Sequence, residues 1–360
     1  MIKVCKRLNN KKRNNLLVNT LQAKHVPCVP SAAVAMFNDM VRQVYSLKDA
    51  KNTIVVGFAE TATAIGAYVA ACLNLPYIHT TRETIFGDQV CFKEEHSHAP
   101  EHNLLIESLR HCDHVLFVED EVTTGNTIRA AVHALRRNTN IFRFTVISYV
   151  NCMTPVQRVV FEKECIEVRY AQYMAADYKD KELEYQSQTV SHSLSSSDCS
   201  LDSYVAVLGS DPRYGVNANV YAADMKRLVD AAPALDRECN ILVIGTEECM
   251  YPAICLGRHY EERGHNVLTH STSRSPIATN TADDYPIRSR YELNSFYDSG
   301  VRTYVYNLKR YDKVIIVTDA TNLGIGMRSL VRCLRTVGNK DISLIQILHT
   351  SEQEGIYNED

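Results

Sequence analysis

The twelve cysteines of this 360-residue sequence include no C-x-x-C pair, and the closest two, Cys249 and Cys255, lie six positions apart. A structural zinc knuckle needs closer pairs, and a secreted disulfide framework belongs to much shorter chains. We therefore interpret the cysteines as reduced thiols in a protein core and expect a cytoplasmic location.

Acidic residues are absent from the first 38 positions, which hold seven lysines and arginines; the first acid is Asp39. The formal net charge of −3 thus combines a start of +7 with a remainder of −10. This balance argues against a general nucleic-acid or membrane binder. We expect residues 1–24 to form a solvated basic tail, with an arm that touches phosphate or RNA as the alternative. No apolar run follows the basic start, so the sequence does not indicate a secretory signal.

A long uncharged segment that could span a membrane is also missing. Residues 54–78 carry Glu60 as their only charge. An acid at the centre of a membrane-spanning helix costs about 2.5–3.5 kcal/mol. A strand over 53–57, a loop, and a helix over 64–73 explain the same residues without that cost.

Predicted strands and helices alternate along the chain. In the first part we expect helix 31–47, strand 53–57, helix 64–73, strand 77–80, a polar stretch 86–103, strand 114–118, helix 126–137 and strand 142–150. In the second part we expect helix 217–231, strand 240–245, helix 251–263, strand 266–270, a polar loop 271–300, strand 313–318, helix 326–336 and strand 342–349. Such alternation is typical of parallel sheets with helices on their faces.

The two parts also resemble each other in sequence. Three pairs of segments align without gaps, with nine of 24, four of nine and three of seven identical positions: 113–136 with 312–335, 52–60 with 240–248, and 79–85 with 271–277. The pairs keep one order along the chain, so we infer an internal duplication. Two unrelated α/β units of similar design are the alternative.

The strongest motif begins with two adjacent carboxylates, Glu119 and Asp120, which follow the apolar strand 114–118. A Thr- and Gly-rich turn comes next and opens a helix; it consists of Thr123, Thr124, Gly125, Asn126 and Thr127. Backbone N–H groups and hydroxyls at a helix N-terminus bind phosphate, and carboxylates accept hydrogen bonds from vicinal sugar hydroxyls. The pattern predicts a sugar-phosphate site, with an ordinary capped helix as the alternative.

This motif resembles the signature of the type I phosphoribosyltransferases, in which the turn holds the 5-phosphate of phosphoribosyl pyrophosphate. The resemblance implies an α/β fold of two tandem parallel-sheet, Rossmann-like domains, the second a degenerate copy. It implies exchange of a nitrogenous base and pyrophosphate through an oxocarbenium-like transition state, with Glu119 and Asp120 as catalytic residues. The implied cofactor is Mg²⁺, bound mainly through phosphoribosyl pyrophosphate, and no motif for direct metal binding is present.

The resemblance also places other parts of the site. It implies a pyrophosphate-binding loop made by Ala59, Glu60, Thr61 and Ala62, with Arg82 as a cation for the pyrophosphate. It implies a lid with Lys93, His96 and His98 as catalytic residues. The alternatives are a plain turn for the loop and a surface salt bridge for Arg82. For the lid they are a solvated loop or a zinc site made by His96, His98 and His102.

A second resemblance covers most of the chain. Ser273-Arg274-Ser275-Pro276 is similar to the T-R-S-P motif of the domain that ends the stress-associated phosphoribosyltransferases of tellurite-resistance operons. The segments G-F-A-E-T-A (57–62) and E-E-H-S-H-A-P-E-H (94–102) are similar to the same family. This resemblance implies synthesis or salvage of a nucleotide or nucleotide-like compound and leaves the base open.

The organisation that we expect has five segments: a basic tail 1–24, a phosphoribosyltransferase domain 25–180, a Ser-rich linker 181–204, a degenerate TRSP domain 205–350 and a tail 351–360. The second domain has lost one carboxylate and the threonines of the turn. Arg274, Asp319, Gly324 and Gly326 remain as candidates for a second site. Either this domain is a copy kept for packing, or it is a modified ligand site.

The expected partners are phosphoribosyl pyrophosphate and a base or nucleotide, without a membrane; a homodimer is left open. Residues that select the base are expected within 169–179, where Tyr170, Tyr173 and Tyr178 either stack on a ring or pack. The alternative to an enzyme is a protein that binds and senses phosphoribosyl pyrophosphate without turnover.

Overall fold

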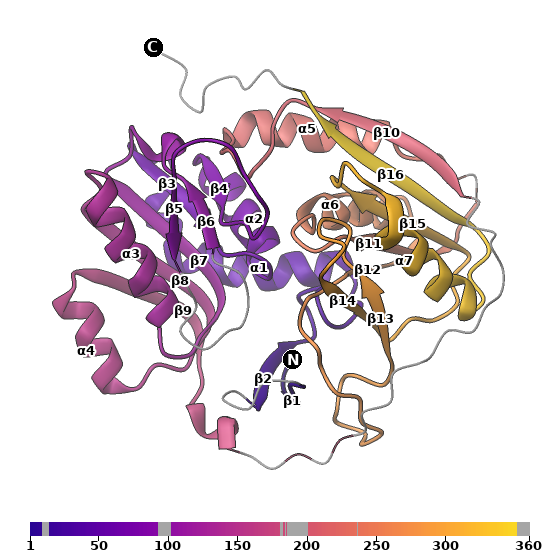
Figure 1. The fold of residues 1–360 in the computed structure, drawn as a ribbon, viewed down its shortest axis with the longest axis horizontal. Coiled ribbons are helices and arrows are strands. Elements are labelled where there is room, and N and C mark those ends of the chain that lie inside the picture. Colours follow the sequence, from indigo (N-terminus) through magenta and orange to yellow (C-terminus); the bar gives the residue numbers. More distant parts are fainter. Residues whose placement is uncertain are drawn as a thin grey trace. The chain divides into compact units, whose positions relative to one another are not determined.

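The computed structural model describes residues 1–8, 14–92, 102–180, 183, 185, 201–235 and 237–350. The chain forms two compact units, each with a five-stranded parallel sheet (Figure 1). The first unit contains residues 35–177 and 209–224, and the second contains 1–34, 178–208 and 225–349. This division differs from the linear one expected from the sequence. No helix among the described residues is long and apolar enough to cross a membrane.

The sheet of the first unit has the strand order β4-β3-β7-β8-β9. Its strands are β3 (Thr53–Gly57), β4 (Tyr77–His79), β7 (His114–Val122), β8 (Arg143–Asn151) and β9 (Ile166–Tyr173). The helices are α1 (Pro30–Val44), α2 (Thr63–Leu73), α3 (Asn126–Asn138) and α4 (Pro155–Lys163), with 3₁₀ turns η1 (Tyr45–Leu47), η2 (Glu107–Leu109) and η3 (Ala176–Asp180). Every residue of β3 is buried, as expected for a parallel strand covered by helices on both faces.

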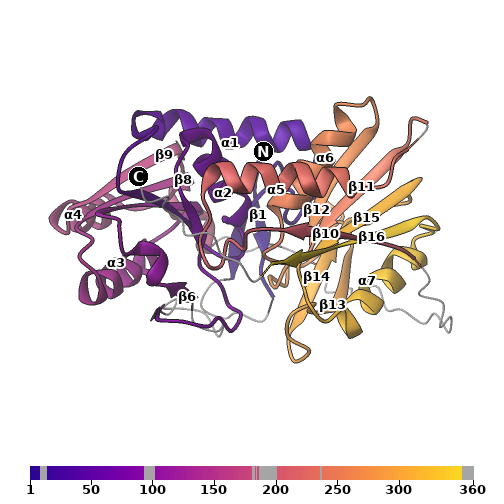
Figure 2. The same cartoon turned by 90° about the horizontal axis from the view of Figure 1, so that it is seen from above.

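The sheet of the second unit has the order β12-β11-β15-β16-β10. Its strands are β10 (Asp202–Leu208), β11 (Asn240–Gly245), β12 (Asn266–Ser271), β15 (Lys313–Thr318) and β16 (Ile342–His349). The helices α6 (Tyr251–Glu261) and α7 (Gly324–Thr336) belong wholly to this unit, and α5 (Ala218–Asp230) belongs to it from residue 225 on. Figure 2 shows α6 and α7 on opposite faces of this sheet.

Strand order and register confirm the internal repeat. Strands β4-β3-β7-β8 and β12-β11-β15-β16 follow each other in the same order in the two sheets. Gly57 pairs with Val118 in the first sheet, and at the aligned positions Gly245 pairs with Val317 in the second. The neighbouring pair β3–β4 matches β11–β12 in the same way. The two sheets therefore share the order of four strands, and three of these strands also share their register at the aligned positions.

The fifth strand breaks the repeat. In the first sheet β9 follows β8 in the chain and pairs with it, whereas in the second sheet the place beside β16 is taken by β10. Strand β10 comes before all other strands of its sheet in the sequence. It also includes residues 202–204, the end of the predicted linker, most of which lies outside the described residues, as does the predicted tail 351–360.

Each half also carries a hairpin where the sequence predicts only polar loop. Strand β5 (Gln89–Phe92) lies within the predicted stretch 86–103 and pairs antiparallel with β6 (His102–Leu105), which begins in that stretch and ends two residues beyond it. In the second half β13 (Arg290–Asn294) pairs with β14 (Arg302–Tyr306). In β5 buried residues alternate with exposed ones. The exposed positions lower the mean hydropathy of this short strand, so its composition is typical of a loop.

The predicted solvated tail over residues 1–24 is wrong for the described residues. Strands β1 (Ile2–Lys6) and β2 (Asn15–Asn19) form an antiparallel hairpin. Cys5, Leu16 and Val18 of this hairpin are buried in one core with Ile277 and Tyr285 of the second unit. Burial of apolar side chains therefore holds the start of the chain, although its composition is basic.

Candidate active site

The two adjacent carboxylates of the motif lie at the end of the central strand of the first sheet. Strand β7 extends beyond the predicted residue 118 to Val122, because Glu119 and Glu121 continue the pairing with β8. Glu119 and Asp120 are partly exposed, and the Asp120 N–H donates to Glu119 Oε1 at 3.0 Å. Ligands of parallel α/β sheets bind at this carboxyl edge.

The Thr- and Gly-rich turn leads directly into α3, which begins at Asn126. Gly125 has a φ of 78°, and a Cβ at this position would overlap the ring of Phe161. Only glycine meets both conditions without strain. Thr123, Thr124, Asn126 and Thr127 are partly exposed around it. The turn thus presents hydroxyls at a helix N-terminus, which is a favourable place for a phosphate.

Helix α3 is anchored to the end of α4 by an ion pair. Arg129 in the second turn of α3 donates through Nε and Nη2 to Glu164. The guanidinium of Arg129 lowers the pKa of Glu164 below its ordinary value. This bidentate contact orients α3 and thereby positions the turn at its N-terminus.

The predicted pyrophosphate loop connects β3 to α2. It contains a cis peptide bond between Ala59 and Glu60. The Ala59 N–H donates to Thr80 Oγ1 at 2.9 Å, and the Thr80 N–H donates to the Gly57 carbonyl at 2.9 Å. Ala59, Glu60 and Ala62 are buried and Thr61 is partly exposed. The loop is therefore held from the end of the neighbouring strand β4.

The predicted site residues of the first unit meet at one edge of its sheet. The loop 58–62 follows β3, the turn follows β7, and Arg82, which is partly buried, follows β4. These three strands are adjacent and parallel, so their carboxyl ends lie side by side. Lys93, His96 and His98 lie outside the described residues.

Thr80 is a positioning residue that our sequence analysis missed. Besides holding Ala59, its hydroxyl lies 3.0 Å from His102 Nδ1, and the imidazole of His102 stacks on Phe92. Thr80 is completely buried. The repeat contains a usable signal, because Thr80 aligns with Thr272, an identical residue.

The three tyrosines of the predicted base-selecting segment are divided between the two units. Tyr178 is fully buried in the second unit, where its carbonyl accepts a hydrogen bond from Asn15 Nδ2. In the first unit Tyr170 and Tyr173 have ring centroids 6.4 Å apart, and Arg158 lies over the Tyr173 ring. Tyr170 and Tyr173 both belong to β9, and Tyr173 is the last residue of that strand.

The four candidates for a second site all lie in the second unit. Arg274 Nε donates to Glu247 Oε2 at 2.7 Å, and Asp319 accepts a hydrogen bond from the Tyr297 hydroxyl. Gly324 and Gly326 form the first turn of α7. All four therefore have contacts with their own unit.

No metal cluster is present among the residues that the structure describes, where no three His, Cys, Asp or Glu side chains are arranged to hold an ion. His96 and His98 of the zinc alternative are outside those residues, and His102 is bonded to Thr80.

Comparison with models of known families assigns both parts of the chain. Residues 1–177 match the model of a phosphoribosyl transferase family, and residues 210–334 match the TRSP domain that lies C-terminal to it. The chain therefore belongs to the phosphoribosyltransferases that carry a C-terminal TRSP domain. No curated protein matched the chain.

Several solved structures are similar to part of the chain. Adenine phosphoribosyltransferase of Giardia lamblia, solved with 9-deazaadenine, is 18% identical over 48% of this chain and 94% of its own, with a TM-score of 0.37. The adenine enzyme of Thermoanaerobacter pseudethanolicus is 13% identical over 48% and 96%, with a TM-score of 0.37. The orotate enzyme of Aeropyrum pernix is 16% identical over 40% and 72%, with a TM-score of 0.30.

Proposed function

We propose that the first unit exchanges a nitrogenous base and pyrophosphate on phosphoribosyl pyrophosphate, in nucleotide or nucleotide-like synthesis or salvage. One observation carries the proposal: adjacent carboxylates, a turn at a helix N-terminus and a strand–helix loop with a nearby arginine share one edge of the sheet. The turn suits the 5-phosphate, the carboxylates suit the ribose hydroxyls, and the loop with Arg82 suits the pyrophosphate.

The proposed mechanism needs no covalent nucleophile. As the bond at the ribosyl carbon breaks, positive charge develops on the ribose, and Glu119 and Asp120 stabilise it while they hold the hydroxyls. The departing pyrophosphate gains negative charge, which Arg82 neutralises. The rest of the rate enhancement comes from fixing the base and the ribose in line. Lys93, His96 and His98 are proposed to add charge over the pyrophosphate.

Magnesium is the proposed cofactor. The cation would be held mainly by the oxygens of phosphoribosyl pyrophosphate and by water. Glu119 and Asp120 are the residues that would face it. The ion would neutralise part of the pyrophosphate charge.

We propose a cytoplasmic protein with a stress-linked role, for which the free cysteines give partial support. All eleven cysteines within the described part of the chain are free thiols. Such usage is typical of a reducing compartment. The proposed stress link rests on the similarity of residues 273–276 to the TRSP motif.

The test removes both charges of the carboxylate pair. We expect Glu119→Gln combined with Asp120→Asn to abolish turnover in a chain that stays folded. Glu121→Gln is the matched control, because it changes the next carboxylate on the same strand and should leave most activity. Turnover is measured as exchange of labelled pyrophosphate into phosphoribosyl pyrophosphate across a panel of bases. Full activity in the double variant would reject the assignment, and saturable binding without exchange on any base would favour a sensor.

A further inference from the structure

The loop 246–250 of the second unit is the counterpart of the pyrophosphate loop 58–62. Both have five residues between a glycine that ends a strand and the first residue of a helix. The Glu247 N–H donates to Thr272 Oγ1 at 3.0 Å, as the Ala59 N–H donates to Thr80. Glu247 therefore occupies the place that Ala59 has in the first unit.

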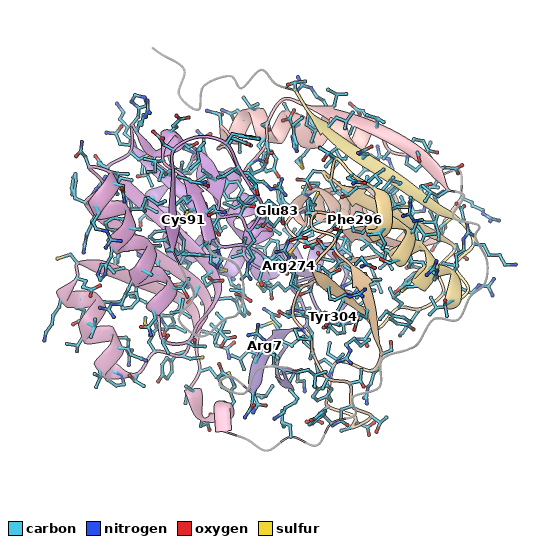
Figure 3. The ribbon with its side chains drawn as sticks, viewed as in Figure 1. Arg7, Glu83, Cys91, Arg274, Phe296 and Tyr304 are labelled. Carbon is cyan, nitrogen blue, oxygen red and sulfur yellow. The ribbon has the colours of Figure 1, made fainter. Side chains whose placement is uncertain are left out.

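The carboxylate of Glu247 is held like a bound anion. Its side chain is 1% exposed. Arg274 Nε donates to one oxygen at 2.7 Å; the Ser295 hydroxyl and the Phe296 N–H donate to the other at 2.7 and 3.1 Å. Figure 3 labels Arg274 and Phe296. Arg274 aligns with Arg82 in the repeat. The arginine expected to face pyrophosphate in the first unit is thus paired with a protein carboxylate in the second.

The carboxylate that the second unit retains from the motif also has a hydrogen-bond donor from its own unit. Asp319, the counterpart of Asp120, accepts a hydrogen bond from the Tyr297 hydroxyl. The oxygen of the same hydroxyl lies 3.1 Å from the Thr246 carbonyl oxygen. Tyr297 and Ser295 belong to the tip of the hairpin β13–β14. A hydroxyl on this carboxylate is what a ribose would supply.

The turn at the start of α7 is closed in a similar way. The Gly324 N–H donates to Asn322 Oδ1 at 3.0 Å, so a side chain of the unit takes a donor that a phosphate would need. A Cβ at Gly326 would lie 2.6 Å from the Ser295 carbonyl oxygen, so the hairpin tip packs directly on this turn.

We infer that the second unit contains a protein-made substitute for a ligand, in which the Glu247 carboxylate takes the place of a pyrophosphate anion. The TRSP domain then binds no phosphoribosyl pyrophosphate. Its anion site is latent, which means that it can bind an external anion only after the Glu247 carboxylate has been removed. The comparison with pyrophosphate rests on the function proposed for the first unit. The latent site itself rests on Arg274, Ser295 and Phe296.

The test asks whether Glu247→Ala, which restores the residue found in the first unit, creates a pyrophosphate site. It uses the full chain with Arg82→Ala, so that the first unit binds weakly, and titration calorimetry with pyrophosphate. We expect Glu247→Ala to raise the affinity by about tenfold or more, as expected for one charge-assisted contact to Arg274. Adding Arg274→Ala should remove the gain. Glu248→Ala, a loss of charge on the next residue, should not produce it.

Two further measurements keep the inference testable if Glu247→Ala is unstable. Pyrophosphate should raise its unfolding midpoint more than that of the Arg82→Ala parent. Conversely, Ala59→Glu should fill the first site and lower pyrophosphate affinity at least about tenfold. No gain and no shift in the Glu247→Ala chain would overturn the inference, as would full affinity in Ala59→Glu. If the unmodified chain binds no pyrophosphate, the proposed function fails, whereas a gain that depends on Arg274 still stands.

Discussion

The Glu247 carboxylate and the Arg274 guanidinium form an ion pair with a 2.7 Å contact, in which the two side chains are 1% and 13% exposed. Removing one member of a buried pair leaves the other charge unpaired, which costs about 3–5 kcal/mol. We therefore expect Arg274→Ala to lower the free energy of unfolding by this amount in urea denaturation. Arg302→Ala, which breaks the exposed contact of Arg302 with Glu292, should cost less than about 1 kcal/mol. Equal losses in the two variants would contradict the role of burial.

Gly125→Ala should impair binding of the 5-phosphate. The added Cβ meets Phe161 and the φ of 78° is unfavourable for alanine, so the turn must shift. We expect a raised KM for phosphoribosyl pyrophosphate and a stability loss of about 1–3 kcal/mol. Gly264→Ala is the matched control: its φ is 89°, but no atom lies within 4 Å of the added Cβ. Equal changes of KM in the two variants would contradict a local effect on the turn.

Thr80→Val should lower activity by loosening the pyrophosphate loop. The change removes the acceptor of the buried Ala59 N–H, which costs about 1–3 kcal/mol. Thr272→Val removes the equivalent bond in the second unit and should cost a similar free energy while activity stays intact. Steady-state kinetics and urea unfolding of both variants decide this. Loss of activity in both would point to general destabilisation.

The buried His270 should lower the free energy of unfolding in acid. Burial in the second unit lowers its pKa from 6.5 to about 4. As the pH falls below 6.5 the unfolded chain takes up a proton that the folded chain does not, so the unfolded state is stabilised relative to the folded state. The loss should grow between pH 6.5 and about 4 and reach about 3 kcal/mol. Urea unfolding of His270→Asn across this range should show a flatter profile, and an unchanged slope would contradict the prediction.

The parallel core could be predicted from the sequence because its strands are continuous apolar runs. The bounds of β3, β11, β15 and β16 agree with the prediction to the residue, since each run ends at a glycine or at polar residues. The extension of β7 through Glu119 could not be predicted, because its carboxylates are typical of loops and the pairing with β8 depends on tertiary contacts.

The hairpins and the fifth strand of the second sheet could not be predicted from the sequence, because they too depend on tertiary contacts. In β1 and β5 the polar side chains mask the buried ones, which pack on segments far away in the chain. For the site, the parallel order of the strands was enough to bring the loops after β3, β4 and β7 together. The pairing of Glu247 with Arg274 was not foreseen, because their repeat counterparts are an alanine and a presumed ligand-binding arginine.

The core that joins Leu16 to Ile277 has a consequence for synthesis on the ribosome. The hairpin β1–β2 leaves the exit tunnel early, whereas its core partners are made about 260 residues later. At about 5–20 residues per second, the hairpin waits on the order of tens of seconds for them. A chain stopped at residue 177, the end of the first family match, would never receive these partners. A cut after residue 177 would therefore separate the hairpin from the residues that bury it.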